Sequence, residues 1–380
     1  MYYISLLSFG SVSEGQSSQS LNQYIRFYPD TPNRTSCELF NIVKIMGTLK
    51  IIGQIELKQF WPEGLSDADT SNILVSVDND SFFYRKDNQS SYRKTKVFNT
   101  ESVIGKTRAK LIKNNKIKVR FQGIDAPELH YKAPPLQNKP DVTPALRAEY
   151  NEKNKSFRQN LSESATFALR KFLRSINKSV VTCQVLSHNV EKPREVVDTY
   201  GRFVANVNVK QHNKTIDLNV WLAKEGWVVP TFYTSMSEEE MAELLSAAKK
   251  GKKKNRIWKY LRTDTGKFKY SLQFRKNVIE FNLGDDNAIL IMPKLFRRQV
   301  SYEMQKKVGL FTGKISEFLT KSKDPFYKTE EFLLEGFDAK LYYIDEFFNG
   351  KKFQLGPSDL VFREKYSNII DENGGFIVNW

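Results

Sequence analysis

The 380-residue chain has very few of the residues that build disulfide frameworks or soft-metal sites. It contains two cysteines, Cys37 and Cys183, and three scattered histidines, His130, His188 and His212. These numbers and spacings exclude a disulfide scaffold, a zinc cluster, a redox pair and the His-rich metal signatures. We expect both thiols to be buried and chemically inert.

Long apolar runs are also missing. No stretch of ~20 apolar residues occurs, which excludes an ordinary membrane-spanning helix. The first ten residues lack the basic segment and the long apolar core of a secretory signal, so we expect a cytoplasmic protein. With 40% hydrophobic and 13% aromatic residues the chain is not disordered throughout, and its length allows two or more domains.

A short acidic turn after an alternating strand is the most informative feature present. Arg120 lies in the strand, Gly123 ends it, and Asp125 and Glu128 fall in a turn that Pro127 stiffens. Phosphodiester hydrolysis needs a cation to neutralise the phosphate and a carboxylate to take a proton from water. Carboxylate oxygens suit Ca²⁺ or Mg²⁺, and arginine can grip a phosphate with two hydrogen bonds. The alternative is a strand followed by a solvated acidic turn.

The spacing Arg-x4-Asp-x2-Glu of Arg120, Asp125 and Glu128 resembles the staphylococcal nuclease-like (thermonuclease) family. The segment 198–202 is similar to the Asp-x-Tyr-Gly-Arg block of that family, with Arg202 at the place of a second phosphate-binding arginine. The resemblance implies that Arg120, Glu128 and Arg202 are catalytic. Glu128 would orient or deprotonate the attacking water, and the two arginines would neutralise the phosphate.

An upstream block, Ser66–Thr70, resembles the Asp-Gly-Asp-Thr segment of the family, with Ala68 in place of glycine. That exchange matters only if the turn needs a positive φ. The resemblance implies that Asp69 and Asp125 hold a divalent ion, Ca²⁺ in the first place and Mg²⁺ as the alternative. Asp80 lies in a competing match for the same block, which leaves either Asp69 or Asp80 as the upstream ligand.

Downstream, the pattern of residues 217–227 predicts a short amphipathic helix that stops at Gly226. This segment resembles the Asn-x-x-Leu-x-x-x-Gly helix of the family. A helix over 238–255 followed by Trp258 is similar to the closing helix of the family. Three aromatic residues are placed beside the bound nucleotide by the resemblance: Tyr200, Phe232 and Tyr233.

The fold class expected from the resemblance is α+β, with a five-stranded OB-like β-barrel, packed helices and a C-terminal α+β domain. The expected divisions are a β-rich extension over 1–46, a nuclease-like domain over 47–261 with insertions near 78–116 and 130–160, and a C-terminal domain over 262–380.

The net charge is +16, and it is unevenly distributed. Residues 83–178 hold 22 Lys/Arg against 8 Asp/Glu, which predicts an electrostatic track for a polyanion beside the motif strand. The alternative is a solvated basic surface. Residues 262–380 hold 19 basic and 17 acidic residues, which favours protein contact, self-association or ligand sensing over a second nucleic-acid surface.

Taken together, these features predict a metal-dependent nuclease that hydrolyses DNA, RNA or both. An active nuclease inside a cell must be restrained, and defence of a bacterium against foreign nucleic acid is one role that meets this condition. Two other functional hypotheses stay open. The chain could be a non-cleaving nucleic-acid-binding or scaffold protein on a nuclease-like fold, or the C-terminal domain could be the functional centre with the barrel as a docking platform.

Overall fold

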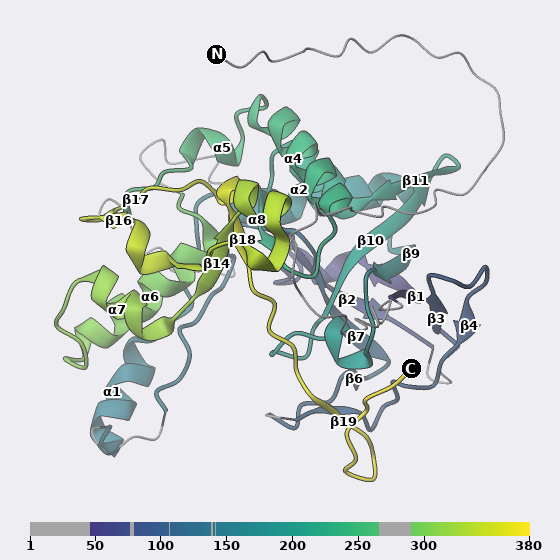
Figure 1. Ribbon diagram of the computed structural model, residues 1–380, viewed down its shortest axis with the longest axis horizontal. Helices are drawn as coiled ribbons and strands as arrows, with labels where there is room; N and C mark the ends of the chain where they lie inside the picture. The colour runs from purple at the N-terminus through teal and green to yellow at the C-terminus, as the bar shows by residue number, and fades with distance from the viewer. Residues whose placement is uncertain (1–45, 77–79, 106, 138–139, 141, 266–289) are drawn as a thin grey trace, which may run out of the picture. The chain divides into compact units, whose positions relative to one another are not determined.

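Five strands close into a β-barrel in the first two thirds of the chain (Figure 1). The computed structural model describes residues 46–76, 80–105, 107–137, 140, 142–265 and 290–380. The barrel strands are β1 (Gly47–Glu56), β2 (Thr70–Leu74), β7 (Lys116–Phe121), β9 (Val180–Ser187) and β10 (Phe203–Gln211). They pair in the order β1–β2–β7–β10–β9 and back to β1, and β7–β10 is the parallel pair of this ring. The expected OB-like barrel with helices is confirmed.

Alternation along the strands explains why they close around one core. In β9 the side chains of Val181, Cys183 and Val185 are buried, whereas Thr182 and Gln184 between them are exposed. Successive side chains of a strand point to opposite faces, so every second residue enters the barrel. The same pattern runs through β10. The inward side chains of all five strands therefore form one hydrophobic core.

The expected insertion near 78–116 adds strands at the edge of the barrel. These are β3 (Phe82–Lys86), β4 (Arg93–Lys94), β5 (Val103–Ile104) and β6 (Ile112–Lys113). The first half of β1 pairs with β3, and its second half pairs with β2. Strand β5 pairs with β19 (Ile369–Ile370), so the last part of the chain lies against this insertion.

Helices α2 (Ser162–Ile176), α3 (Leu218–Glu225), α4 (Glu238–Lys252) and α5 (Ile257–Tyr260) follow or lie between the barrel strands along the chain. Asp217 caps α3 by accepting hydrogen bonds from two backbone N–H groups of its first turn. Gly226 ends the helix in the left-handed conformation with φ +75°, which confirms the expected stop. Ser237 and Glu240 form a capping box at the start of α4.

The C-terminal part contains α6 (Pro293–Lys307), α7 (Ile315–Ser322), α8 (Thr329–Glu335) and several short strands. The strands are β14 (Pro325–Lys328), β15 (Tyr342–Tyr343), β16 (Phe348–Asn349), β17 (Lys352–Phe353) and β18 (Leu360–Phe362). The hairpin β16–β17 turns at Gly350 and Lys351. The sequence over 268–290 alternates in a way that predicts strands, and it lies outside the described residues except for Leu290.

The C-terminal part shares both a sheet and a core with the region before it. Strand β13 (Phe232–Tyr233) pairs in parallel with β18, in a sheet ordered β13–β18–β14–β15. A second hydrophobic cluster joins side chains of α6 and α7 to residues of the 130–160 insertion, which contains α1 (Pro144–Lys153). Residues Lys44–Trp380 form one compact unit. The division at 261 and 262 stays a prediction.

In the described part of the chain, none of the helices has both the length and the apolar character needed to cross a lipid bilayer.

Candidate active site

The acidic turn follows directly from the end of β7. Gly123 has φ +75°, a conformation that side chains rarely adopt, and it lets the chain reverse into β8 (Ile124–Asp125). Strand β8 pairs with β12 (Val229–Pro230), which fixes the backbone of Asp125. The Asp125 side chain is fully buried, and that of Glu128 is 13% exposed. The turn therefore holds two carboxylates away from bulk water.

Asp69 joins this turn from the residue before β2. Its Oδ2 accepts a hydrogen bond from the backbone N–H of Ala126 at 3.1 Å, and its Oδ1 accepts one from the hydroxyl of Thr70 at 3.2 Å. Ala68 is not among the positive-φ residues, so the turn does not need the family's glycine. Asp80 is exposed and paired with Lys94. Asp69 rather than Asp80 therefore lies beside Asp125.

Arg120 and Arg202 lie on the outer side of two neighbouring parallel strands. Val204 is opposite Arg120 in the register of β7 and β10, and Arg202 precedes Val204 by two residues, which places it on the same face. Nη2 of Arg120 lies 3.6 Å from Oδ1 of Asp125 and is buried without a hydrogen-bond partner. Arg202 instead donates its Nε–H to Oδ2 of Asp198 at 2.8 Å. The two arginines share a face, but only Arg120 contacts the carboxylates.

The three aromatic candidates differ in accessibility. Tyr200 is 75% exposed, and the guanidinium of Arg202 lies 5.4 Å from its ring centroid. Tyr233 is partly buried, with Arg120 5.5 Å from its ring centroid. Phe232 is fully buried in the barrel core. Its ring cannot stack on a nucleotide from this position, which corrects the expectation for Phe232.

Arg297 of α6 is the site residue that the sequence motifs did not indicate. Its Nη1 and Nη2 donate to Oδ1 and Oδ2 of Asp125 at 3.2 and 3.0 Å, and Nη1 also donates to Oε1 of Glu128. The only signal for it in the sequence is a group of basic residues in the first two turns of the helix: Lys294, Arg297 and Arg298. Nothing in that group specifies the carboxylates as its partners.

Burial acts to raise the pKa of all three carboxylates, and neighbouring charges either add to this effect or oppose it. Burial raises the pKa of Asp69 to about 6, and the neighbouring Asp125 carboxylate adds to this shift. Burial also raises the pKa of Glu128 to about 8. For Asp125, burial would raise the pKa, but Arg297 and Arg120 beside it keep the pKa below its usual range.

Hydrogen bonds to the side chains of Gln159 and Asp67 hold the backbone of the Glu128 turn in place. Gln159 is fully buried, and its Oε1 accepts a hydrogen bond from the backbone N–H of Glu128 at 3.1 Å. Its Nε2 donates to the carbonyl of Ile291 at 2.7 Å, two residues before α6 begins. Asp67 accepts a hydrogen bond from the backbone N–H of Leu129 at 2.9 Å.

The chemical type of these donors fits a divalent cation, but their present arrangement does not. Asp69, Asp125 and Glu128 offer the hard oxygen atoms that Ca²⁺ and Mg²⁺ prefer. Among the residues that the structure describes, however, no group of three or more His, Cys, Asp or Glu side chains is placed to hold a metal ion. The guanidinium of Arg297 lies against Asp125 and Glu128, where such an ion would need their oxygens.

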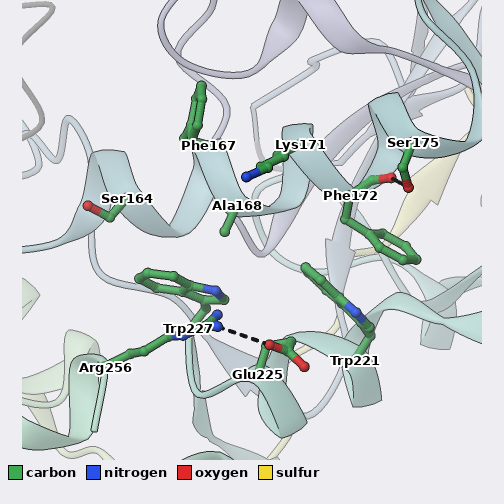
Figure 2. Close-up of a pocket in the computed structure, with 10 residues that line it drawn as sticks. All are labelled: Ser164, Phe167, Ala168, Lys171, Phe172, Ser175, Trp221, Glu225, Trp227 and Arg256. Atoms are coloured by element: carbon green, nitrogen blue, oxygen red, sulfur yellow. Dashed lines mark hydrogen bonds and ion pairs between the residues drawn. The ribbon is translucent and has the colours of Figure 1, made fainter. Parts of the chain in front are cut away.

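A separate apolar groove lies between α2 and α3 (Figure 2). It encloses about 570 Å³, and Phe172 stacks on Trp221 along it with ring centroids 4.3 Å apart. Arg256 lies over the ring of Trp227 and pairs with Glu225. None of the three carboxylates lines this groove, so it is distinct from the acidic site.

One family of known proteins matches the part of the chain that contains both the motif and most of the barrel. Residues 118–260 match the family model described as staphylococcal nuclease homologue, a range that includes Arg120, Asp125, Glu128 and Arg202. Strands β1 and β2 and Asp69 precede this range and complete the barrel. No curated protein matches the chain. Residues 118–260 are thus part of a domain of the staphylococcal nuclease homologue family, and the chain closes the barrel typical of that fold.

Proposed function

We propose that the protein is a nuclease that hydrolyses phosphodiester bonds of nucleic acids at the cluster of Arg120, Asp69, Asp125 and Glu128. One observation carries the proposal. Arg120, whose buried Nη2 has no partner at hydrogen-bond distance among the described residues and lies 3.6 Å from Oδ1 of Asp125, stands beside a cluster of buried carboxylates at the end of a barrel strand. Buried polar groups are normally paired, so this N–H is available to an oxygen atom of a substrate.

In the proposed reaction the arginines and Glu128 have different roles. Arg120 donates to a non-bridging phosphate oxygen and stabilises the charge that develops on it, and Arg202 would add a second donor after leaving Asp198. Glu128 is the group that takes a proton from the attacking water. Tyr233 and Tyr200 would contact the nucleotide.

A divalent ion, Ca²⁺ in the first place, would be held by Asp69 and Asp125 once Arg297 is withdrawn. When bound, such an ion neutralises phosphate charge.

The substrate we propose is DNA, RNA or both. The basic segment 83–178 borders the motif strand, and much of its charge is exposed, including Arg93, Lys94, Lys96 and Lys118. Clustered cations of this kind attract a phosphate backbone without reading its sequence. We expect binding to weaken steeply as the salt concentration rises.

A non-cleaving nucleic-acid-binding role is the second candidate, and one observation favours it. Arg297 binds Asp125 and Glu128 in this conformation, so the two groups that would act on a metal ion and on water are engaged with a guanidinium. A protein in which this contact never opens would bind nucleic acid and leave it intact.

The test is cleavage of labelled single-stranded DNA, double-stranded DNA and RNA with Ca²⁺, Mg²⁺ or EDTA. The intact protein is compared with Glu128→Gln, and Glu149→Gln serves as the control because Glu149 forms only an exposed ion pair with Lys153. Metal-dependent cleavage that Glu128→Gln abolishes and Glu149→Gln retains would support the nuclease. Salt-sensitive binding without cleavage under any condition would support the binding role.

We also propose that the protein acts in the cytoplasm against foreign nucleic acid, as the sequence predicts. Expression of the intact chain and of Glu128→Gln in a bacterial host, followed by phage challenge, tests this role. Equal plaque numbers with and without the intact protein would contradict this defence role.

A further inference from the structure

Arg297 makes the contacts with Asp125 and Glu128 that a cation would make. Its two terminal nitrogens face both oxygens of Asp125, and one of them also reaches Glu128. A planar guanidinium that binds a carboxylate through two parallel hydrogen bonds is among the stronger pairings in proteins. The Asp125 side chain is only 1% exposed, so this pair is shielded from water and from salt.

The fold holds α6 firmly in this position. Leu295, Phe296 and Val300 of α6 are buried in the second hydrophobic cluster. Arg298, the next residue along the chain, forms a two-nitrogen pair with Asp324, with 2.7 Å between Nη2 and Oδ1. The helix is therefore anchored on both sides of Arg297, and Arg297 is the side chain it presents to the acidic site.

The start of α6 and the Glu128 turn share one buried side chain. Gln159 accepts a hydrogen bond from the backbone N–H of Glu128 and donates one to the carbonyl of Ile291. Displacement of α6 that carries Ile291 away would break the bond to Gln159 and loosen the Glu128 turn. The position of the helix and the geometry of the turn are thus mechanically connected.

We propose that α6 is an internal latch, meaning a helix whose Arg297 blocks the acidic site. This proposal rests on the proposed nuclease function. Arg297 and a divalent cation bind Asp125 and Glu128 in mutually exclusive ways, and the enzyme in this conformation is latent. The site becomes competent when α6 withdraws Arg297. Two cations cannot occupy the same carboxylate oxygens because their charges repel at contact distance. The apparent affinity for metal is then reduced by the fraction of molecules in which the latch is open.

The first experiment measures metal binding directly, by calorimetric titration of Ca²⁺ and Mn²⁺ into the intact protein and into Arg297→Ala. We expect Arg297→Ala to bind metal about tenfold or more tightly, because the competing guanidinium is gone. Lys306→Ala is the matched control. It removes an exposed basic residue from the last turn of the same helix, away from the anchoring contacts, and we expect its metal affinity to equal that of the intact protein. Unchanged, weakened or undetectable metal binding by Arg297→Ala would overturn the latch.

Two further measurements guard against a variant that fails to fold. Arg297→Gln keeps a hydrogen-bonding side chain without the charge, and we expect it to gain metal affinity in the same direction. In the intact protein, saturating Ca²⁺ should speed hydrogen exchange of the amides of α6, because the ion displaces Arg297. Exchange in α6 that is unaffected by a bound ion would overturn the proposal without any variant.

Cleavage assays on the same proteins separate this proposal from the function on which it rests. Tighter metal binding by Arg297→Ala, with no cleavage by any form, would support the latch and overturn the nuclease. Metal-dependent cleavage by the intact protein, with unchanged metal affinity in Arg297→Ala, would support the nuclease and overturn the latch. Faster cleavage by Arg297→Ala at limiting metal, with tighter metal binding, is the result we expect.

Discussion

Gly251 of α4 lies so close to the carbonyl of Ala223 in α3 that a Cβ added to it would be 2.0 Å from that oxygen. The two helices can pack at this distance only because one of them has no side chain at the crossing. An exchange to alanine would gain about 1 kcal/mol of helix propensity. The neighbour is backbone and cannot rotate away, so we expect the clash to outweigh this gain.

Gly251→Ala should therefore destabilise the protein, by about 1–3 kcal/mol for overpacking of this kind. Urea unfolding measures the change. Lys250→Ala, at the exposed neighbouring position, is the control and should leave the free energy of unfolding nearly unchanged. Equal stability of Gly251→Ala and the parent would show that the helices can separate without cost.

Asn219→Ala should also destabilise the fold, by about 3 kcal/mol. Asn219 is fully buried, and its amide donates to the carbonyls of Gln122 at 2.8 Å and Ala205 at 3.2 Å. Its Oδ1 accepts from the backbone N–H of Val207 at 3.2 Å. Truncation removes these three hydrogen bonds inside the core, and of the two carbonyls only that of Ala205 keeps another donor among the described residues, the backbone N–H of Gln122 at 2.9 Å. Thermal unfolding checks the loss, and Lys224→Ala on the exposed side of the same helix should unfold like the parent.

Arg120→Lys should slow cleavage by about 100-fold while the fold stays intact, since losing one charge-stabilising donor has an effect of this size. Lysine keeps the charge beside Asp125 but cannot reproduce the planar fork of the guanidinium. Steady-state cleavage rates and circular dichroism are the measurements. Lys118→Arg makes the reverse exchange two residues earlier on the same face of β7 and should retain activity. A full rate for Arg120→Lys would mean that the Arg120 fork does not contact the reacting phosphate.

His188 should make stability depend on pH in a defined direction. Burial lowers its pKa, and its Nδ1 lies 3.3 Å from the hydroxyl of Thr48. Its ordinary pKa is about 6.5, so the unfolded chain binds the proton more readily than the folded one. The contribution of His188 is therefore present above about pH 6.5 and is lost as the pH falls through that value towards the folded pKa.

Unfolding free energies at pH 7.5 and pH 5.5 for the parent and His188→Gln test this, because all other groups titrate alike in both proteins. We expect the parent to lose more stability than the variant on acidification. Equal losses would show that His188 titrates normally in the folded state.

Cys183 should be unreactive in the native protein. Burial raises the pKa of its thiol to about 12, and the side chain is 1% exposed. A thiol, unlike a thiolate, is a poor nucleophile. In a Cys37→Ser background, a thiol reagent at pH 8 should modify no cysteine before unfolding and one cysteine in denaturant. Modification of the native protein at the rate of a free thiol would contradict the buried position.

The part of the site that could be predicted from the sequence is the part carried by short local spacing. Arg120, Asp125 and Glu128 lie within one strand and turn, so their proximity follows from the chain itself. Arg297 is 169 residues beyond Glu128, and its arrival depends on the packing of α6, which no local pattern encodes. Tertiary contacts of this kind can be recognised only once the fold is known.

Phe232 shows a different limit. It and Tyr233 form a two-residue strand, and in any strand one of two neighbours points inward and the other outward. The sequence places two aromatic residues at the right distance but does not say which faces the core. The fold settles this, because Phe232 is fully buried whereas Tyr233 is only partly buried.

The parallel pairing of β7 with β10 has a consequence for how the protein folds. Between Arg120 and Val204 lie the 130–160 insertion, α2 and β9, so this pairing closes a long loop and ranks among the slower steps of folding. Before β10 docks, Arg120 and Arg202 belong to segments that move independently. In a nascent chain the two arginines are therefore not yet on one face, and they come to share it only when the barrel closes.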